Sequence, residues 1–182
     1  MTALDIAPEL IDRARVLDQQ AGVMVTYHIA PAEQTGLDAG AFDLVTAGQC
    51  WHWFDRPTAA QEVKRLLVAG GAVVIAHLDW IPLPGNVVEA TEQLILRHNP
   101  NWAMSGGTGL YPAWLADLAS AEFTDLETFS FDLDLTYTHE AWRGRIRASA
   151  GVAASLSVEE VAVFDRELRD LLQSDYPDDP LA

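Results

Sequence analysis

The chain is poor in cysteine and in positive charge. Its 182 residues include one cysteine, Cys50, and only 11 lysines and arginines against 27 acidic residues. A single cysteine cannot form an internal disulfide, which is consistent with a reducing, cytoplasmic location. The formal net charge of -16 argues against nucleic acid and anionic membranes as partners, because an acidic surface repels both.

Long apolar runs, a basic leader and metal-ligand spacing are also missing. No apolar run reaches the roughly 18 residues of a membrane-spanning helix, and residues 1–5 lack the basic region of a signal peptide. The five histidines, at positions 28, 52, 77, 98 and 139, lack the spacing of zinc ligands, so we expect no metal site. A hydrophobic content of 49% predicts instead a globular protein with a substantial core.

The first 80 residues alternate apolar strands with amphipathic helices, which is typical of parallel α/β units. Helices are expected after Pro8 and Pro57, and a glycine pair at 70–71 is expected to stop the second. Strands are expected at 2–6, 23–27, 42–48 and 72–76. The fold class is therefore α/β with a mostly parallel sheet. Four residues predict the inward face of the first helix, namely Leu10, Ile11, Ala14 and Leu17.

The second half of the chain is predicted to be more helical. Three helix starts carry capping residues, namely Asn86 with Glu89, Thr138, and Ser157 with Glu160. Residues 129–137 alternate apolar and polar side chains, which predicts a strand at or near a sheet edge. We expect one domain over 1–182, with a core at 1–80 and 121–182 and a variable helical cap at 81–120.

The stretch from Phe42 to Asp55 contains the first candidate site. A short apolar strand is followed at once by Gln49, Trp51, His52, Trp53 and Phe54. In open α/β sheets ligands bind beyond the carboxyl ends of the strands, which is where these side chains are expected. The alternative is that the tryptophans simply pack beneath the next helix and that His52 is structural.

A second candidate is Asp5, at the carboxyl end of the first strand. An acidic residue there accepts hydrogen bonds from ribose hydroxyls in nucleotide-binding α/β folds, although it is also a common helix cap. Together with Ala32-Glu33, the run from Ala41 to Val45, and the run from Glu62 to Gly71, it resembles the class I S-adenosylmethionine-dependent methyltransferases. The segment from Gln49 to Asp55 is similar to the branch related to trans-aconitate methyltransferases.

The resemblance implies a Rossmann-like sheet with helices on both faces, S-adenosylmethionine as cofactor and a small molecule as methyl acceptor. Asp5 would hold the ribose hydroxyls, and Ala32, followed by Glu33, would offer its backbone N–H to the adenine. Gln49 and Trp51 would line the methionine end of the pocket. The family often has an aspartate where this chain has Pro31, so adenine selectivity must come from elsewhere. The aromatic residues Trp51, Trp53 and Phe54 would also favour a sulfonium cation.

Two arginines stand out in so acidic a chain. Arg143 and Arg147 share one face of a predicted helix and could clamp a carboxylate substrate, with His52 and Trp53 also on the substrate side. The alternative is a solvated basic face that pairs with nearby acids. A carboxylate acceptor is already ionised at pH 7 and needs no base, so we assign His52 no catalytic role.

The chain departs from the family in lacking two strands. Only four residues precede Asp5, so the glycine-rich strand and loop are absent, and nothing after Tyr176 predicts the last strand. We interpret the chain as a truncated methyltransferase, through a misassigned start codon or as a fragment. The strands of Asp5 and Asp43 would then pair directly, pair with another chain or stay apart, and self-association through exposed edges is expected.

Two alternative functions remain. A non-catalytic fragment or interaction module would keep the α/β core without holding the cofactor. A nicotinamide-dependent oxidoreductase would share the ribose acid but would leave the Ala32-Glu33 and Gln49 to Asp55 segments unexplained.

Overall fold

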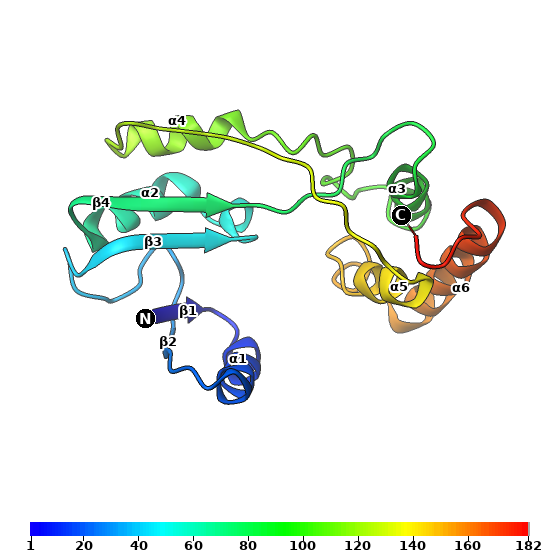
Figure 1. Cartoon of the computed structure of the whole chain (residues 1–182), viewed down its shortest axis with the longest axis horizontal. Coiled ribbons are helices and arrows are strands. Elements are labelled where there is room, and N and C mark those ends of the chain that lie inside the picture. Colours follow the sequence, from blue (N-terminus) through cyan, green and yellow to red (C-terminus); the bar gives the residue numbers. More distant parts are fainter. Residues whose placement is uncertain (182) are drawn as a thin grey trace. The chain divides into compact units, whose positions relative to one another are not determined.

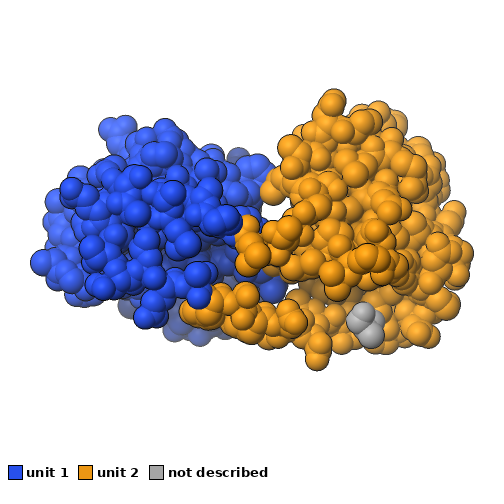
Figure 2. Space-filling view, turned by 90° about the horizontal axis from the view of Figure 1, so that it is seen from above, with its two compact units in different colours: residues 1–78, 111–128 blue, residues 79–110, 129–182 orange. Residues whose placement is uncertain are grey.

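A computed structural model describes residues 1–181 of the chain, which form two compact units. The first unit comprises Met1–Leu78 and Tyr111–Thr128, and the second comprises Asp79–Leu110 and Phe129–Ala182 (Figure 2). We expected residues 121–182 to join the core formed by 1–80, but most of them group with residues 79–110 instead. That the whole chain acts as one domain stays a prediction.

The first unit contains four strands in two separate sheets (Figure 1). Strand β1 (Thr2–Asp5) pairs in parallel with β2 (Thr26–Ile29), and β3 (Phe42–Gly48) pairs in parallel with β4 (Leu67–Ala76). The α/β class with parallel strands is therefore confirmed. Helix α1 (Pro8–Ala21) connects the first pair, and η1 (Trp51–Trp53) and α2 (Arg56–Leu66) connect the second.

The two sheets are not joined to each other. No ladder links β1, which ends at Asp5, to β3, which contains Asp43, within the described residues 1–181. These two strands therefore do not pair directly, and pairing with another chain stays a prediction. Each pair therefore keeps unpaired backbone N–H and C=O groups along an outer edge, which is the arrangement that invites pairing with another strand.

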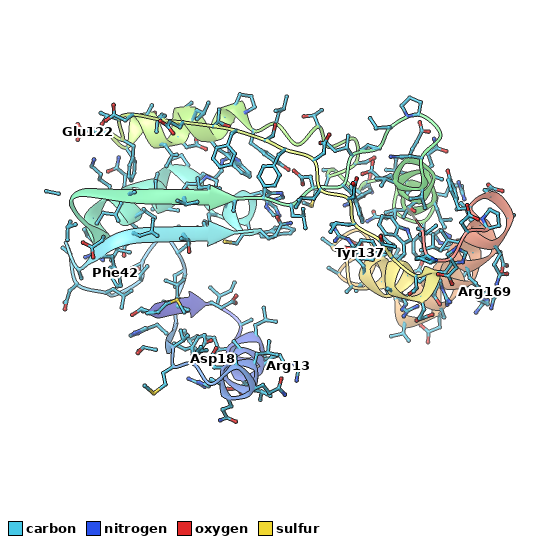
Figure 3. The ribbon with its side chains drawn as sticks, viewed as in Figure 1. Arg13, Asp18, Phe42, Glu122, Tyr137 and Arg169 are labelled. Carbon is cyan, nitrogen blue, oxygen red and sulfur yellow. The ribbon has the colours of Figure 1, made fainter. Side chains whose placement is uncertain are left out.

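Helix α1 buries less of its apolar face than the sequence predicts. It begins at Pro8, whose fixed φ suits a first helical position, and it ends at Gly22, which adopts a left-handed φ of 67°. Figure 3 labels Asp18 on α1. The hydroxyl of Tyr27 on β2 donates a hydrogen bond of 2.9 Å to Asp18. Of the four residues expected inward, Ile11 is buried, but Leu10 and Leu17 are 60% and 49% exposed. That part of the prediction was wrong, because α1 packs mainly on β1 and β2.

Helix α2 ends earlier than predicted. It stops at Leu66, and β4 begins at the next residue, so the two glycines do not terminate the helix. They lie instead where β4 holds extra residues opposite β3, between the Leu67 and Ala72 pairings. A Cβ at Gly71 would lie 3.1 Å from the carbonyl oxygen of Asp43, so only glycine fits there comfortably.

The core of the first unit lies between the β3–β4 sheet, α2 and α4 (Pro112–Ser120). Its buried members are mostly small or aliphatic residues, with one large aromatic side chain: Ala47, Trp51, Ala59, Ala60, Val63, Leu67, Leu118 and Ala121. This core holds the carboxyl ends of β3 and β4 in place, which is where the candidate site lies.

The second unit is a helical cluster of α3 (Val87–His98), α5 (His139–Arg147) and α6 (Val158–Asp175). The predicted caps are confirmed: the side chains of Asn86, Thr138 and Ser157 accept hydrogen bonds from backbone N–H groups three residues on. The core contains Leu94, Ile95, Trp142, Ile146, Val152, Phe164, Leu168 and Leu172. No helix in residues 1–181 combines the length and the apolar character needed to cross a bilayer.

The predicted strand at 129–137 is absent. The segment is extended but makes no ladder, and only Tyr137 forms an isolated antiparallel bridge, with Leu181. Phe129 and Phe131 are 84% and 70% exposed, so the apolar face expected to be buried is open. A strand requires a hydrogen-bonded neighbour, and no strand of residues 1–181 forms a ladder with this segment. Alternation of side chains was therefore not sufficient.

Candidate functional site

Gln49 connects the carboxyl ends of β3 and β4. Its backbone N–H donates to the carbonyl of Ala76 at 3.0 Å, and its side-chain Nε2 donates to the carbonyl of Leu78 at 3.1 Å. Its Oε1 also accepts from the N–H of Leu78. These bonds hold Gln49 at a φ of 58°, a left-handed conformation that costs a non-glycine residue about 1–2 kcal/mol. Its amide is thus engaged by backbone, and its contact with cofactor stays a prediction.

The aromatic residues Trp51 and Trp53 lie on a single turn of 3₁₀ helix, η1, which directs their side chains to different sides. With about three residues per turn, successive side chains of η1 point in different directions. Trp51 is 1% exposed and packs against Phe54 at 5.7 Å between ring centroids, whereas Trp53 is 62% exposed. The indole N–H of Trp51 has no hydrogen-bond partner in residues 1–181. Trp51 therefore lies in the core, while Trp53 faces outward.

His52 lies between these tryptophans and forms a pair with His77. Nδ1 of His52 is 3.0 Å from Nε2 of His77, and Nδ1 of His77 is 3.4 Å from the hydroxyl of Tyr111. The ring of Tyr111 stacks on that of Trp114 with centroids 3.9 Å apart. His52, His77 and Tyr111 thus form a polar chain over the carboxyl ends of β3 and β4.

Sequence reasoning missed His77, Tyr111 and Trp114. A signal was present for His77, because it directly follows the apolar strand β4, and the same rule had selected the residues after β3. Tyr111 and Trp114 come from a segment 34 or more residues further along the chain, at the start of α4. Nothing local in the sequence indicates that this segment reaches the histidines.

The two acidic candidates support loops at the ends of the strands. Oδ1 of Asp5 accepts from the N–H of Ala7 at 2.8 Å, the local capping bond that we considered as the alternative. Oε1 of Glu33 accepts from the N–H of Asp55 at 2.8 Å, which joins the loop after β2 to the start of α2. Ala32, half-buried, precedes Glu33 in this loop. These two bonds use only one oxygen of each carboxylate, namely Oδ1 of Asp5 and Oε1 of Glu33.

The loop that carries Ala32 and Glu33 is anchored by Glu62 of α2. Its Oε1 accepts from the backbone N–H of Thr35 at 2.9 Å and from the Thr35 hydroxyl at 2.6 Å. Hydrogen bonds from Arg65 first, and from Thr35 after it, lower the pKa of Glu62 to about 2, although partial burial acts against them. This carboxylate therefore stays ionised and holds the loop close to α2.

Known proteins can now be compared with this geometry. Residues 1–75 match the methyltransferase domain family. The ubiquinone biosynthesis O-methyltransferase of Xanthomonas axonopodis pv. citri is 30% identical over 152 residues, which cover 82% of this chain and 62% of that enzyme. Residues 1–75 are therefore similar to the methyltransferase domain family, and most of the chain is similar to an O-methyltransferase. The chain spans less than two thirds of the length of this relative.

Solved structures share the fold of this chain. A Bacillus halodurans protein assigned as a methyltransferase matches with a TM-score of 0.57 and 21% identity, over 95% of this chain and 68% of its own. The [4+2]-cyclase SpnF matches with a TM-score of 0.51 and 16% identity, over 96% and 62%. Since one fold occurs in proteins with such different names, the reaction must be argued from the site. The trans-aconitate branch stays a prediction.

The predicted arginine clamp lies in the second unit. Arg147 contacts Asp165 at 2.6 Å and Glu140 at 2.9 Å, and Arg143 contacts the same two acids. Burial acts to raise the pKa of Asp165, but hydrogen bonds from both arginines outweigh it and lower that pKa. The guanidinium groups thus pair with nearby acids, as the alternative held, and their contact with a substrate stays a prediction.

In residues 1–181, no three histidine, cysteine, aspartate or glutamate side chains gather in a way that could hold a metal ion. The polar groups at the strand ends are instead two carboxylates, a histidine pair and a tyrosine. Such a set can accept hydrogen bonds from hydroxyl groups.

Proposed function

We propose that this protein transfers a methyl group from S-adenosylmethionine to an oxygen atom of a small molecule. The match of residues 1–75 to the methyltransferase domain family carries the proposal. The ubiquinone biosynthesis O-methyltransferases, at 30–31% identity, support oxygen as the methylated atom. The polar chain over the carboxyl ends of β3 and β4 supports the same edge of the fold as the place of reaction.

The residues at the strand ends fit the adenosine half of this cofactor. The second carboxylate oxygen of Asp5 would accept from the ribose hydroxyls, and the N–H of Ala32 would donate to the adenine ring. The exposed face of Trp53 suits a sulfonium cation, because the ring face is electron-rich. When bound, the cofactor supplies an electrophilic methyl group. The chain's own part is to orient the acceptor and to exclude water.

The acceptor is better described as a hydroxyl than as a carboxylate. A carboxylate would be held by Arg143 and Arg147, yet both guanidinium groups already contact Asp165 and Glu140. A carboxylate substrate would have to displace these two acids, which lie on α5 and α6. A hydroxyl acceptor instead requires a proton acceptor nearby, and the histidine pair offers one.

Isothermal titration of the folded chain with S-adenosylmethionine and S-adenosylhomocysteine tests the proposal. Because the sheet is split beside Asp5, we expect binding much weaker than low-micromolar, but saturable and competitive between the two ligands. Low-micromolar binding by a monomer would show that the split does not limit the site. No heat with either ligand would favour a non-catalytic interaction module. Stabilisation by a nicotinamide dinucleotide alone would favour an oxidoreductase.

A further inference from the structure

Arg145 on α5 is a partly buried arginine without an acidic partner. Among residues 1–181, four arginines are partly buried, at positions 56, 143, 145 and 147. The other three each form an ion pair with a carboxylate. For Arg145, no carboxylate oxygen of the described residues lies within 4.0 Å. The chain has 27 acidic residues, so its overall charge does not explain why this guanidinium lacks one.

The position of Arg145 on the helix explains the difference. An α-helix turns by about 100° per residue, so Arg143 and Arg147 share the face that pairs with acids, whereas Arg145 lies about 200° from Arg143. On its own side Arg145 meets aromatic rings. Its guanidinium carbon is 5.2 Å from the ring centroid of Trp80 and 5.8 Å from that of Tyr137. Cation–π attraction offsets part of the cost of removing this charge from water.

The two rings beside Arg145 are themselves anchored in the second unit. Nε1 of Trp80 donates to Oε1 of the buried Glu92 at 2.8 Å. Tyr137, labelled in Figure 3, exchanges backbone hydrogen bonds of 3.3 and 2.7 Å with Leu181. Both rings also contact Trp142, with centroids 5.6 and 5.5 Å apart. The guanidinium is therefore held between fixed groups, which lowers the entropy that a ligand must overcome on binding.

Most N–H donors of Arg145 remain for another group. A guanidinium carries five N–H donors in a planar fork. Within residues 1–181, Arg145 makes one hydrogen bond, from Nη1 to the hydroxyl oxygen of Tyr137 at 3.0 Å. Arg143, by contrast, donates from all three of its nitrogens to carboxylates. The aromatic contacts of Arg145 use its charge and leave its other donors unused. A carboxylate matches them, since its two oxygens accept two parallel N–H bonds.

We propose that Arg145 is the centre of a binding site for a small planar carboxylate, bordered by Trp80 and Tyr137. The inference concerns binding within the second unit and does not depend on the proposed methyl transfer. One guanidinium matches the single charge of a carboxylate, whereas a phosphate dianion would meet stronger repulsion from so acidic a chain. The two rings favour a carboxylate attached to a flat, apolar group.

Benzoate is the probe, because its carboxylate is attached to a flat ring and is ionised at pH 7. Benzamide has nearly the same shape without the charge, and inorganic phosphate has charge without the ring. Isothermal titration of the folded chain should show saturable binding of benzoate, weaker binding of phosphate and none of benzamide. Arg145→Gln should weaken benzoate binding by about tenfold or more, since it removes hydrogen bonds between charged groups. Arg145→Lys keeps the charge but loses the fork, so the loss should be smaller but measurable.

Arg166→Gln is the matched control, because Arg166 is exposed on α6 of the same unit and the variant removes the same charge. It should leave benzoate affinity unchanged, and melting temperatures show whether each variant keeps its fold. Equal weakening by Arg166→Gln and Arg145→Gln would mean that overall charge attracts the probe, and would overturn the site.

Four other outcomes would also contradict the proposal. A folded wild-type chain that does not bind benzoate, or that binds benzamide equally well, would overturn the site. Phosphate binding as tight as benzoate binding would overturn the carboxylate assignment. Unchanged affinity in folded Arg145→Lys would overturn the role of the planar fork. Loss of binding in Arg143→Lys but not in Arg145→Gln would assign the carboxylate to the clamp predicted from the sequence.

Discussion

At the scale of the residue, Trp51 and Trp53 show that neighbouring side chains on one helical turn can differ widely in burial. Trp51 is buried in the core of the first unit, whereas Trp53 is largely exposed two residues later. From the sequence, Trp51, Trp53 and Phe54 were expected to act together at one site. The burial of Trp51 favours a structural role, although its predicted contact with the cofactor has its own test.

We expect Trp51→Ala to lower the free energy of unfolding by about 3–5 kcal/mol, because it leaves a large cavity beneath α2. Trp51→Phe should cost clearly less, since it keeps much of the ring and removes an indole N–H that has no partner in residues 1–181. Urea denaturation measures both, and cofactor affinity is measured in parallel. Lost affinity in a Trp51→Phe variant of wild-type stability would support the pocket role instead.

Glu62 gives a pH-dependent prediction. Its folded pKa, about 2, is below its ordinary value of 4.5, so its contribution is fully present above about pH 5 and is lost as pH falls toward 2. The side chain is 10% exposed, and a shift of this size corresponds to about 3 kcal/mol. Glu62→Gln should therefore destabilise the chain at pH 7 by up to this amount.

Urea denaturation of wild type and Glu62→Gln from about pH 7 to pH 3 checks this. The difference in unfolding free energy should shrink steadily as the pH falls, because protonated glutamate and glutamine then resemble each other. A difference that does not change with pH would show that the carboxylate charge is not what anchors the loop of Thr35. The same loss should loosen the Ala32-Glu33 loop, since Thr35 holds it to α2.

At the scale of the element, helices and strands differed in how well local sequence predicted them. The helices that begin after Asn86, Thr138 and Ser157 formed as expected, because a capping side chain bonds to backbone only three residues away. Residues 129–137 have the alternation of a strand, yet no strand forms. A helix satisfies its backbone internally, whereas a strand depends on a neighbour that may lie anywhere in the chain.

The exposed apolar segment at 129–137 leads to a prediction about self-association. We propose that this segment and the exposed strand edges promote contacts between copies of the chain. Phe129 and Phe131 are exposed on a stretch without ladder partners, and apolar surface of this kind promotes contacts between copies. We expect wild type to self-associate as its concentration rises, measured by light scattering after size exclusion. Phe131→Lys should reduce this association while changing stability by no more than about 0.5 kcal/mol.

Ser130→Lys is the matched control, because it adds the same charge one residue away on the other side of the alternating segment. It should reduce association less than Phe131→Lys does. Equal effects would mean that charge alone, and not the phenylalanine surface, governs the contact. A strictly monomeric wild-type chain at high concentration would contradict the proposal for both the segment and the strand edges.

At the scale of the whole molecule, the class of fold followed from sequence. Alternating strand and helix patterns over the first 80 residues predict parallel α/β units, and the described strands are parallel in both sheets. The edge of the sheet at which Gln49 and His52 lie was also predictable, because it depends only on chain direction. These features depend on local order along the chain, which a sequence records directly.

Tertiary structure decided which groups meet. The contact between His52 and His77 spans 25 residues, and that between Arg143 and Asp165 spans 22. In each case the partner was chosen by the packing of separate elements, which no local pattern encodes. The split between β1 and β3, and the open segment at 129–137, likewise depend on whether a neighbouring strand is present. Local propensity determines where an element can begin. Packing between elements that are distant in the sequence determines whether strand edges, charged groups and aromatic rings find partners.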